Sequence, residues 1–112
     1  MEIAVQRISG PAVVVRPTGR LTAADAPELK AVLSDLVAAG STRVVVDLEA
    51  TTFLDSSGLG ALVAGLRATR TAGGDLTIAR PGGQVLDVLE LTTMIRVLPA
   101  HETVADAFAA LS

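Results

Sequence analysis

The sequence predicts a single α/β domain over residues 1–112 with a mixed β-sheet, in which an initial hairpin is followed by parallel strands, and with about four helices. A chain of 112 residues is long enough for one hydrophobic core and too short for two. Half of its residues are apolar, which suits a well-buried core. Segments with strand patterning alternate along the chain with segments of helical spacing, as in sheets whose parallel strands are joined by crossover helices.

The predicted hairpin occupies the first part of the chain. Residues 3–8 and residues 12–16 are rich in β-branched side chains. The Ser-Gly-Pro sequence of residues 9–11 lies between them and has a composition that turns favour. We expect Thr18 and Gly19 to close the second strand.

The first helix is predicted from five apolar residues with the i, i+3, i+4, i+7, i+8 spacing of one helix face: Leu29, Val32, Leu33, Leu36 and Val37. Gly40 is expected to end this helix. Its start is open between two interpretations. Thr22 and Asp25 resemble a capping box, whereas Asp25 as the N-cap places Pro27 in the first turn, where a missing N–H costs little.

A central strand is predicted over residues 43–48, because a continuous apolar run flanked by charge is typical of a strand buried on both faces. A second helical stripe follows the Leu54–Asp55 step and ends at Gly73 and Gly74; its members are Leu59, Leu62, Val63 and Leu66. These apolar stripes are more typical of core than of an exposed interface.

The last third of the chain repeats the alternation. Residues 75–79 read as a strand and residues 85–89 as a helix. Residues 95–98, Ile-Arg-Val-Leu, indicate a last short strand. Val104, Phe108 and Leu111 have the spacing of a terminal helix.

Several classes of partner are disfavoured by composition. A membrane span needs about 18 consecutive apolar residues, and charged residues interrupt every apolar stretch before that length. The first residues lack the pattern of a secretory signal, and cysteine is absent, so we expect a cytoplasmic protein. The net charge of −3 and the two aromatic residues do not fit nucleic-acid binding.

The sequence also argues against an enzyme, a metal site or a cofactor. The Gly-x-Ser-x-Gly motif of serine hydrolases is missing, and His101, the only histidine, is expected in solvent or at a helix start. With one histidine and no cysteine, the chain lacks ligands for a metal centre. Gly58 and Gly60 would need a further glycine where Val63 stands to form a dinucleotide-binding loop.

The most informative segment is residues 53–60, which joins the end of a buried strand to a helix start. Four of the five residues from Ser56 to Gly60 are small. Negative charge at the start of a helix is stabilised by the helix dipole, so a phosphate on Ser56 would be tolerated there. A partner fitted to the bare hydroxyl would meet new charge beside Asp55. The simpler interpretation is that these residues only cap the helix.

The segment resembles the STAS domain of bacterial anti-sigma factor antagonists. The resemblance rests on Asp-Ser-Ser-Gly-Leu-Gly at residues 55–60, on the strand at residues 44–48 with Phe53 and Leu54, and on Gly-Gly-Asp-Leu at residues 73–76. Gly-Arg-Leu at residues 19–21 also fits, and the likeness covers essentially the whole chain.

The resemblance implies partner switching that regulates sigma-factor-dependent transcription. The unphosphorylated protein would bind an anti-sigma factor that is also a serine kinase, phosphorylation of Ser56 would release it, and a PP2C-type phosphatase would restore binding. The residues expected at the contact are Thr22, Asp55, Ser57, Gly58, Leu59 and Gly60. Ser57 is expected to cap the helix or hydrogen-bond locally. Thr22 stands where many relatives have aspartate, so partner choice or kinase recognition is expected to differ.

A second function fits the same resemblance. A STAS module that never cycles phosphate, as a subunit of a transport or stress-signalling assembly, would keep Ser56 for packing or docking alone. Phosphate incorporation at Ser56 separates the two functions.

Overall fold

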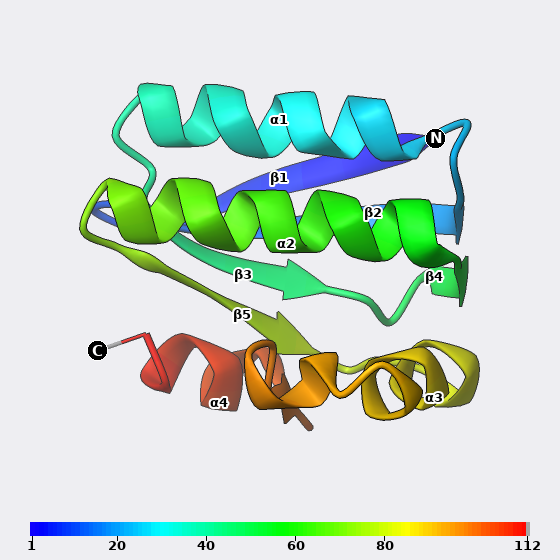
Figure 1. Ribbon diagram of the computed structural model, residues 1–112. Helices are drawn as coiled ribbons and strands as arrows, with labels where there is room; N and C mark the ends of the chain where they lie inside the picture. Colours follow the sequence, from blue (N-terminus) through cyan, green and yellow to red (C-terminus); the bar gives the residue numbers. More distant parts are fainter. Residues whose placement is uncertain (112) are drawn as a thin grey trace.

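The structure is a computed structural model that describes residues 1–111. These residues form a six-stranded mixed sheet with four α-helices (Figure 1). The strands are β1 (Glu2–Ser9), β2 (Ala12–Leu21), β3 (Arg43–Asp47), β4 (Thr51–Leu54), β5 (Asp75–Ala79) and β6 (Ala100–His101). The helices are α1 (Ala26–Ala38), α2 (Ser56–Thr71), α3 (Gly83–Leu91) and α4 (Val104–Ala109), with a 3₁₀ turn, η1 (Met94–Arg96), after α3.

The strand order is β1-β2-β3-β5-β6, with β4 paired to the end of β2. Strands β1 and β2 are antiparallel, and every other pairing is parallel. Helix α1 connects β2 to β3, α2 connects β4 to β5, and α3 lies between β5 and β6. The predicted fold class, a hairpin followed by parallel strands with crossover helices, is confirmed.

The core lies mainly between the sheet and helices α1, α2 and α3. Its buried side chains come from alternate strand positions such as Val44 and Val46, and from Leu33 and Leu62 of the helices. A smaller cluster covers the other face, where α4 packs over Val45. Because both of its faces are covered, β3 is buried as the sequence predicts.

Strand β2 continues past Gly19, so the prediction that Thr18 and Gly19 close it is wrong. Gly19 has φ +106°, and the register with β4 shifts between Gly19 and Arg20. The glycine therefore forms a bulge instead of a strand end. The strand pairs with β3 as far as Val15 and with β4 from Gly19 onward. This change of partner places the end of β2 beside the strand that leads into Ser56.

The short strand predicted over residues 95–98 is also wrong. Thr93 takes a left-handed conformation with φ 60°, and the carbonyl oxygen of Met94 accepts hydrogen bonds from the N–H groups of Val97 and Leu98. The segment is thus a turn whose apolar pattern buries Leu98, and the strand follows it as β6.

Helix α1 takes the second of the two predicted starts. Asp25 occupies the N-cap position and Pro27 lies in the first turn, but the Asp25 carboxylate makes no capping hydrogen bond. Gly40 follows the helix with φ +95°, as predicted.

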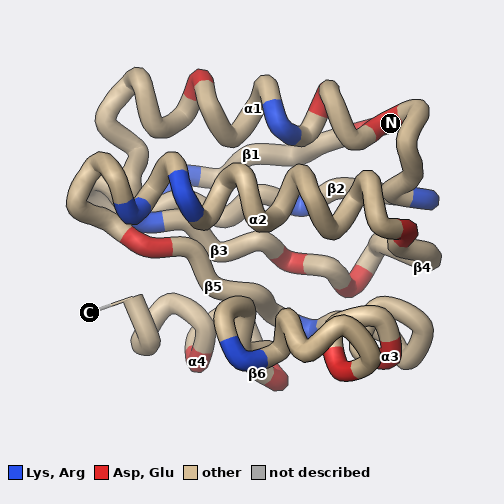
Figure 2. Tube along the Cα trace, viewed as in Figure 1, with Lys and Arg blue, Asp and Glu red and all other residues tan. Residues whose placement is uncertain are grey.

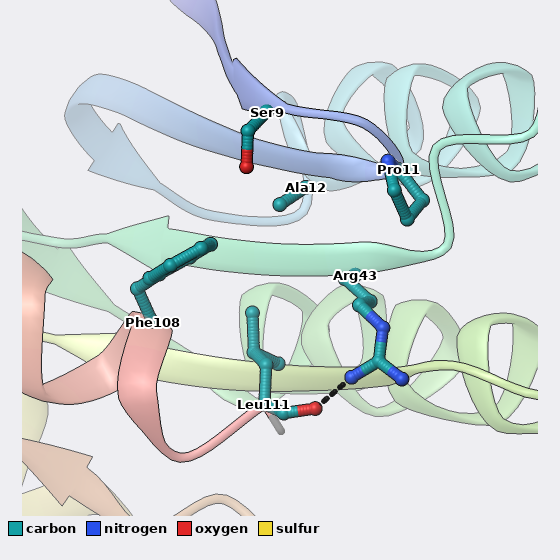
Figure 3. A pocket seen from close by; sticks show the side chains of 6 residues that line it. All are labelled: Ser9, Pro11, Ala12, Arg43, Phe108 and Leu111. Atoms are coloured by element: carbon teal, nitrogen blue, oxygen red, sulfur yellow. Dashed lines mark hydrogen bonds between the residues drawn. The ribbon is translucent and has the colours of Figure 1, made fainter.

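Helix α4 is fastened to the sheet near its carboxyl-terminal end. The guanidinium group of Arg43 donates a hydrogen bond to the carbonyl oxygen of Leu111 (Figure 3). Phe108 lies over a shallow hollow beside this contact, next to Ala12 at the start of β2.

Candidate functional site

The start of helix α2 is held by Asp55, which uses both carboxylate oxygens. Its Oδ1 accepts a hydrogen bond from the N–H of Gly58 at 2.9 Å and so caps the helix. Its Oδ2 accepts one from the N–H of Ala23 at 3.2 Å, in the loop between β2 and α1. One carboxylate therefore fixes the position of two segments that are 32 residues apart in the sequence.

Ser56 is the first residue of α2, and its side chain is exposed. Among residues 1–111 no hydrogen bond involves its hydroxyl or its N–H group. Ser57 is exposed as well. The expectation that it caps the helix or hydrogen-bonds locally is wrong, because Asp55 provides the cap and the Ser57 hydroxyl makes no hydrogen bond with residues 1–111. Two serine hydroxyls thus project from one helix start without being used by the fold.

The next residues divide between buried and exposed positions. Gly58 and Leu59 are buried, whereas Gly60 is exposed. A Cβ atom on Gly58 would clash with the carbonyl oxygen of Leu21 and lie 2.7 Å from Leu54 Cδ1, whereas one on Gly60 would meet nothing within 4 Å. Gly58 therefore allows α2 to approach the ends of β2 and β4, and Gly60 leaves open space at the surface.

A groove lies between the first turns of α1 and α2, which run side by side (Figure 1). It has a volume of about 470 Å³ and is lined by small or short side chains together with one lysine: Ala23, Ala26, Pro27, Lys30, Ser57, Gly60 and Ala61. We call it the α1–α2 groove. Its lining includes Ser57, the residue after Ser56. The groove therefore presents small side chains with one cation, Lys30, and one hydroxyl, that of Ser57.

Thr22 lies at the edge of the same site. Its side chain is half-buried, and its carbonyl oxygen accepts hydrogen bonds from Asp25 N–H at 3.0 Å and Ala26 N–H at 2.8 Å. Through its neighbour Ala23, the Thr22 loop is joined to Asp55. The structure thus brings Thr22 and the residues of α2 together, while their contact with a partner stays a prediction.

Sequence reasoning missed Gln84, which fastens the strand before the site. The side-chain amide of this α3 residue accepts a hydrogen bond from the N–H of Leu54 at 2.8 Å and donates one to the carbonyl oxygen of Leu54 at 3.0 Å. Leu54 directly precedes Asp55, so α3 helps to position the start of α2. The partners are 30 residues apart, and no local pattern announces them.

A buried ion-pair network at the end of β3 was also missed. Asp47 Oδ2 lies 2.8 Å from Arg16 Nη2 and 2.6 Å from Arg80 Nη2, and its side chain is fully buried. Burial raises the pKa of Asp47, but hydrogen bonds from Arg80, the Glu49 N–H and Arg16 outweigh that effect, so the pKa lies below its usual value. The network joins β2, β3 and the residue that follows β5. Figure 2 shows acidic positions where β3 ends.

The prediction that His101 lies in solvent or at a helix start is wrong. His101 is the last residue of β6 and is half-buried. Within residues 1–111 no group of three or more histidine or acidic side chains could hold a metal ion. No helix in the same range is long and apolar enough to cross a membrane.

Comparison with known proteins finds one matching family and several similar structures. The family model described as the STAS domain matches residues 2–107. A Thermotoga maritima protein assigned as an anti-sigma factor antagonist has a TM-score of 0.90 at 23% identity, over 97% of this chain and 93% of that one. An anti-sigma factor antagonist from Mycobacterium paratuberculosis has a TM-score of 0.84 at 26% identity, over 98% and 92%.

A third similar structure is the Bacillus cell fate determinant SpoIIAA in its phosphorylated form. Its TM-score is 0.76 at 20% identity, over 99% of this chain and 100% of that one. The family match spans nearly all of the described residues, with α2 and its capping Asp55 inside it. The chain belongs to the STAS domain family.

Proposed function

We propose that this protein is an anti-sigma factor antagonist that is switched by phosphorylation of Ser56. The unphosphorylated form binds an anti-sigma factor with serine kinase activity, and the phosphorylated form releases it. A PP2C-type phosphatase returns the protein to the binding form. The observation that carries the proposal is the exposed Ser56 hydroxyl, which the fold does not use, at the first position of α2.

The geometry around Ser56 suits a modification that leaves the fold intact. Helix α2 has 16 residues, and its dipole stabilises negative charge at an exposed first turn by about 0.3–1 kcal/mol. The cap on this helix comes from Asp55, so phosphorylation of Ser56 removes no capping hydrogen bond. The phosphate is therefore tolerated by the protein itself.

The same phosphate changes the surface that a partner meets. It adds about −1.5 to −2 charges next to the Asp55 carboxylate. A partner that buries the Ser56 helix start would have to desolvate this charge without a cation prepared for it, which costs free energy. We therefore infer that docking is lost while folding persists.

The docking surface that we propose is formed by the α2 start, the Thr22 loop and the α1–α2 groove. Ser57 and Gly60 line this groove. Gly58 and Leu59 are buried and contribute indirectly, by setting the position of the helix. The relatives support the proposal, since SpoIIAA, described as an anti-sigma factor antagonist, has been observed unphosphorylated and phosphorylated.

The test is intact-mass measurement of the chain after incubation with ATP and its anti-sigma factor, followed by peptide mapping. We expect one added phosphate, located on Ser56. Ser56→Ala should bind the anti-sigma factor but accept no phosphate, and Ser57→Ala, the matched control one residue further on, should still be modified. Stable binding without any phosphate incorporation would favour a STAS module that does not cycle phosphate.

A further inference from the structure

Arg20 stacks on Phe53 near the end of β2, beside the strand that leads into Ser56. The two residues are paired across β2 and β4, and the guanidinium carbon of Arg20 lies 4.3 Å from the centre of the Phe53 ring. Phe53 is half-buried and Arg20 is exposed, so the ring supports a cation at the surface. Stacking covers one face of the guanidinium plane and leaves its edge, which carries the N–H donors, open.

The side-chain N–H donors of Arg20 have no acceptor among residues 1–111. Most arginines of the chain use theirs in the fold, on carbonyl oxygens or carboxylates: Arg7, Arg16, Arg43, Arg70 and Arg80. Arg67 and Arg96 have no such hydrogen bond within the described part of the chain, and no aromatic ring there holds them. Arg20 is therefore the one arginine that the described residues orient and leave without an acceptor.

Arg20 borders the proposed docking surface. The carbonyl oxygen of Leu21 accepts a hydrogen bond from the N–H of Asp55 at 3.3 Å. Arg20 and Ser56 are the chain neighbours of these two residues, so standard backbone dimensions place their Cα atoms within about 15 Å of each other. A protein interface covers about 800 Å² on each partner, a patch roughly 30 Å across, which is wide enough to include both.

The Arg20 side chain approaches the site from the face opposite the α1–α2 groove. Leu21 is buried, and a Cβ atom on Gly58 would meet it, so the Leu21 side chain points toward α2. Because successive side chains of a strand point to opposite faces, Arg20 points away from α2. A partner that reaches both Arg20 and the groove must span the end of the β2–β4 pair, where Ser56 lies.

The carboxylates of the docking surface are already engaged. Asp55 accepts hydrogen bonds from two backbone N–H groups, and the amino group of Met1 lies 3.4 Å from Asp25 Oδ1 and 3.5 Å from Glu28 Oε2. Any acceptor for Arg20 other than water must therefore come from outside residues 1–111. Of the groups that a protein partner offers, a carboxylate fits best, because its two oxygens match two N–H donors of a guanidinium group.

We propose that Arg20 binds a carboxylate of the anti-sigma factor and so selects partners with an acidic residue facing the end of β2. This inference rests on the proposed function and adds the chemistry of the partner to it. The stack on Phe53 lowers the cost of ordering the guanidinium group when the partner binds. The same contact disfavours the phosphorylated form, because a phosphate on Ser56 adds negative charge to the surface that the partner's acidic residue approaches.

The test measures binding of the purified anti-sigma factor to the unmodified protein by calorimetry, without ATP, at low salt and at high salt. At about 50 mM NaCl, Arg20→Gln should bind roughly tenfold more weakly than wild type, because a charged hydrogen bond is lost. Arg20→Lys keeps the charge but not the paired donors, so its affinity should fall between the two. At about 500 mM, where the Debye length is about 4 Å, the difference between wild type and Arg20→Gln should shrink to about threefold.

Arg67→Gln is the matched control. Arg67 is an exposed arginine of α2 that lies roughly 16 Å further along the helix than Ser56. This variant should bind as wild type does. Thermal midpoints show that every variant is folded, and Arg20→Gln should still accept a phosphate on Ser56 when the anti-sigma factor is saturating.

Four results would overturn the role of Arg20. They are equal affinity of Arg20→Gln and wild type at low salt, a loss of the same size at both salt concentrations, an Arg20→Lys affinity as low as that of Arg20→Gln, and an equal loss in Arg67→Gln. Wild-type binding without any phosphate on Ser56 would contradict the switch and not the Arg20 contact, so the two failures are distinguishable.

Discussion

An alanine at Gly58 and an alanine at Gly60 are the same chemical change, two residues apart on α2, and the structure predicts opposite effects on stability. At Gly60 the new methyl group meets nothing within 4 Å, so the gain in helix propensity of about 0.5–1 kcal/mol should appear in the free energy of unfolding. At Gly58 it would clash with the carbonyl oxygen of Leu21 and approach Leu54 Cδ1 to 2.7 Å. Overpacking of this kind costs about 1–3 kcal/mol, which exceeds the propensity gain.

The two variants should therefore differ by about 2 kcal/mol, with Gly60→Ala the more stable. For a chain of 112 residues this corresponds to roughly 8 °C between their thermal midpoints. Circular dichroism melts of wild type and both variants provide the measurement, since the chain has neither Trp nor Tyr for intrinsic fluorescence. If Gly58→Ala melts at or above Gly60→Ala, the close approach of α2 to β2 on which the site depends is wrong.

The same pair separates folding from partner binding. Gly60→Ala adds a methyl group to the α1–α2 groove, and we expect it to weaken binding of the anti-sigma factor roughly tenfold although it stabilises the fold. Gly83→Ala is the control, because its new methyl group also meets nothing within 4 Å but lies at the start of α3, outside the groove. Equal affinity of Gly60→Ala and Gly83→Ala would exclude the groove from the docking surface.

Three further predictions concern the site and the residues that support it. Asp47→Asn should lower the free energy of unfolding by about 2 kcal/mol near neutral pH, because Arg80 loses its buried partner. Since the folded-state pKa of Asp47 is depressed, the wild type should lose this contribution as the pH falls from 3.8 through that lower pKa. Urea titrations in which the variant loses as much unfolding free energy as the wild type over this pH range would contradict the network. Gln84→Met should cost about 1–3 kcal/mol, because both backbone groups of Leu54 lose a partner, and should speed amide hydrogen exchange at the start of α2; unchanged exchange would show that the clamp does not position the site. Ser56→Asp should weaken partner binding while its thermal midpoint stays within about 2 °C of wild type, whereas Ser56→Ala should bind normally; calorimetry that finds equal affinities would remove the switch.

The parts of the fold that were predicted correctly have local causes. The hairpin follows from a glycine-proline turn between two β-branched runs, and α2 follows from apolar residues at helical spacing that begin after Asp55. The start of the candidate site could be located because a capping aspartate, two serines and two glycines are adjacent in the sequence. Each of these signals lies within one element, where periodicity and turn chemistry are informative.

The parts that were missed depend on contacts between distant residues. Gly19 looked like a strand end because a glycine bulge and a strand end share the same composition, and only pairing with β4 distinguishes them. The Gln84 clamp on Leu54 spans 30 residues, and Asp47 meets Arg80 across 33. The apolar run at residues 95–98 resembled a strand, but the left-handed Thr93 turns the chain first and uses Leu98 for the core.

The most direct test of the central claim compares two forms of the same protein. The chain fully phosphorylated on Ser56 and the unmodified chain are titrated with the anti-sigma factor by isothermal calorimetry, in the same buffer and without ATP. Because binding would desolvate the phosphate without a cation to compensate it, the phosphorylated form should bind at least about a hundredfold more weakly, equivalent to about 2.7 kcal/mol. Its thermal midpoint should be almost unchanged. Equal affinity of the two forms would contradict the account, whatever the stability of either one.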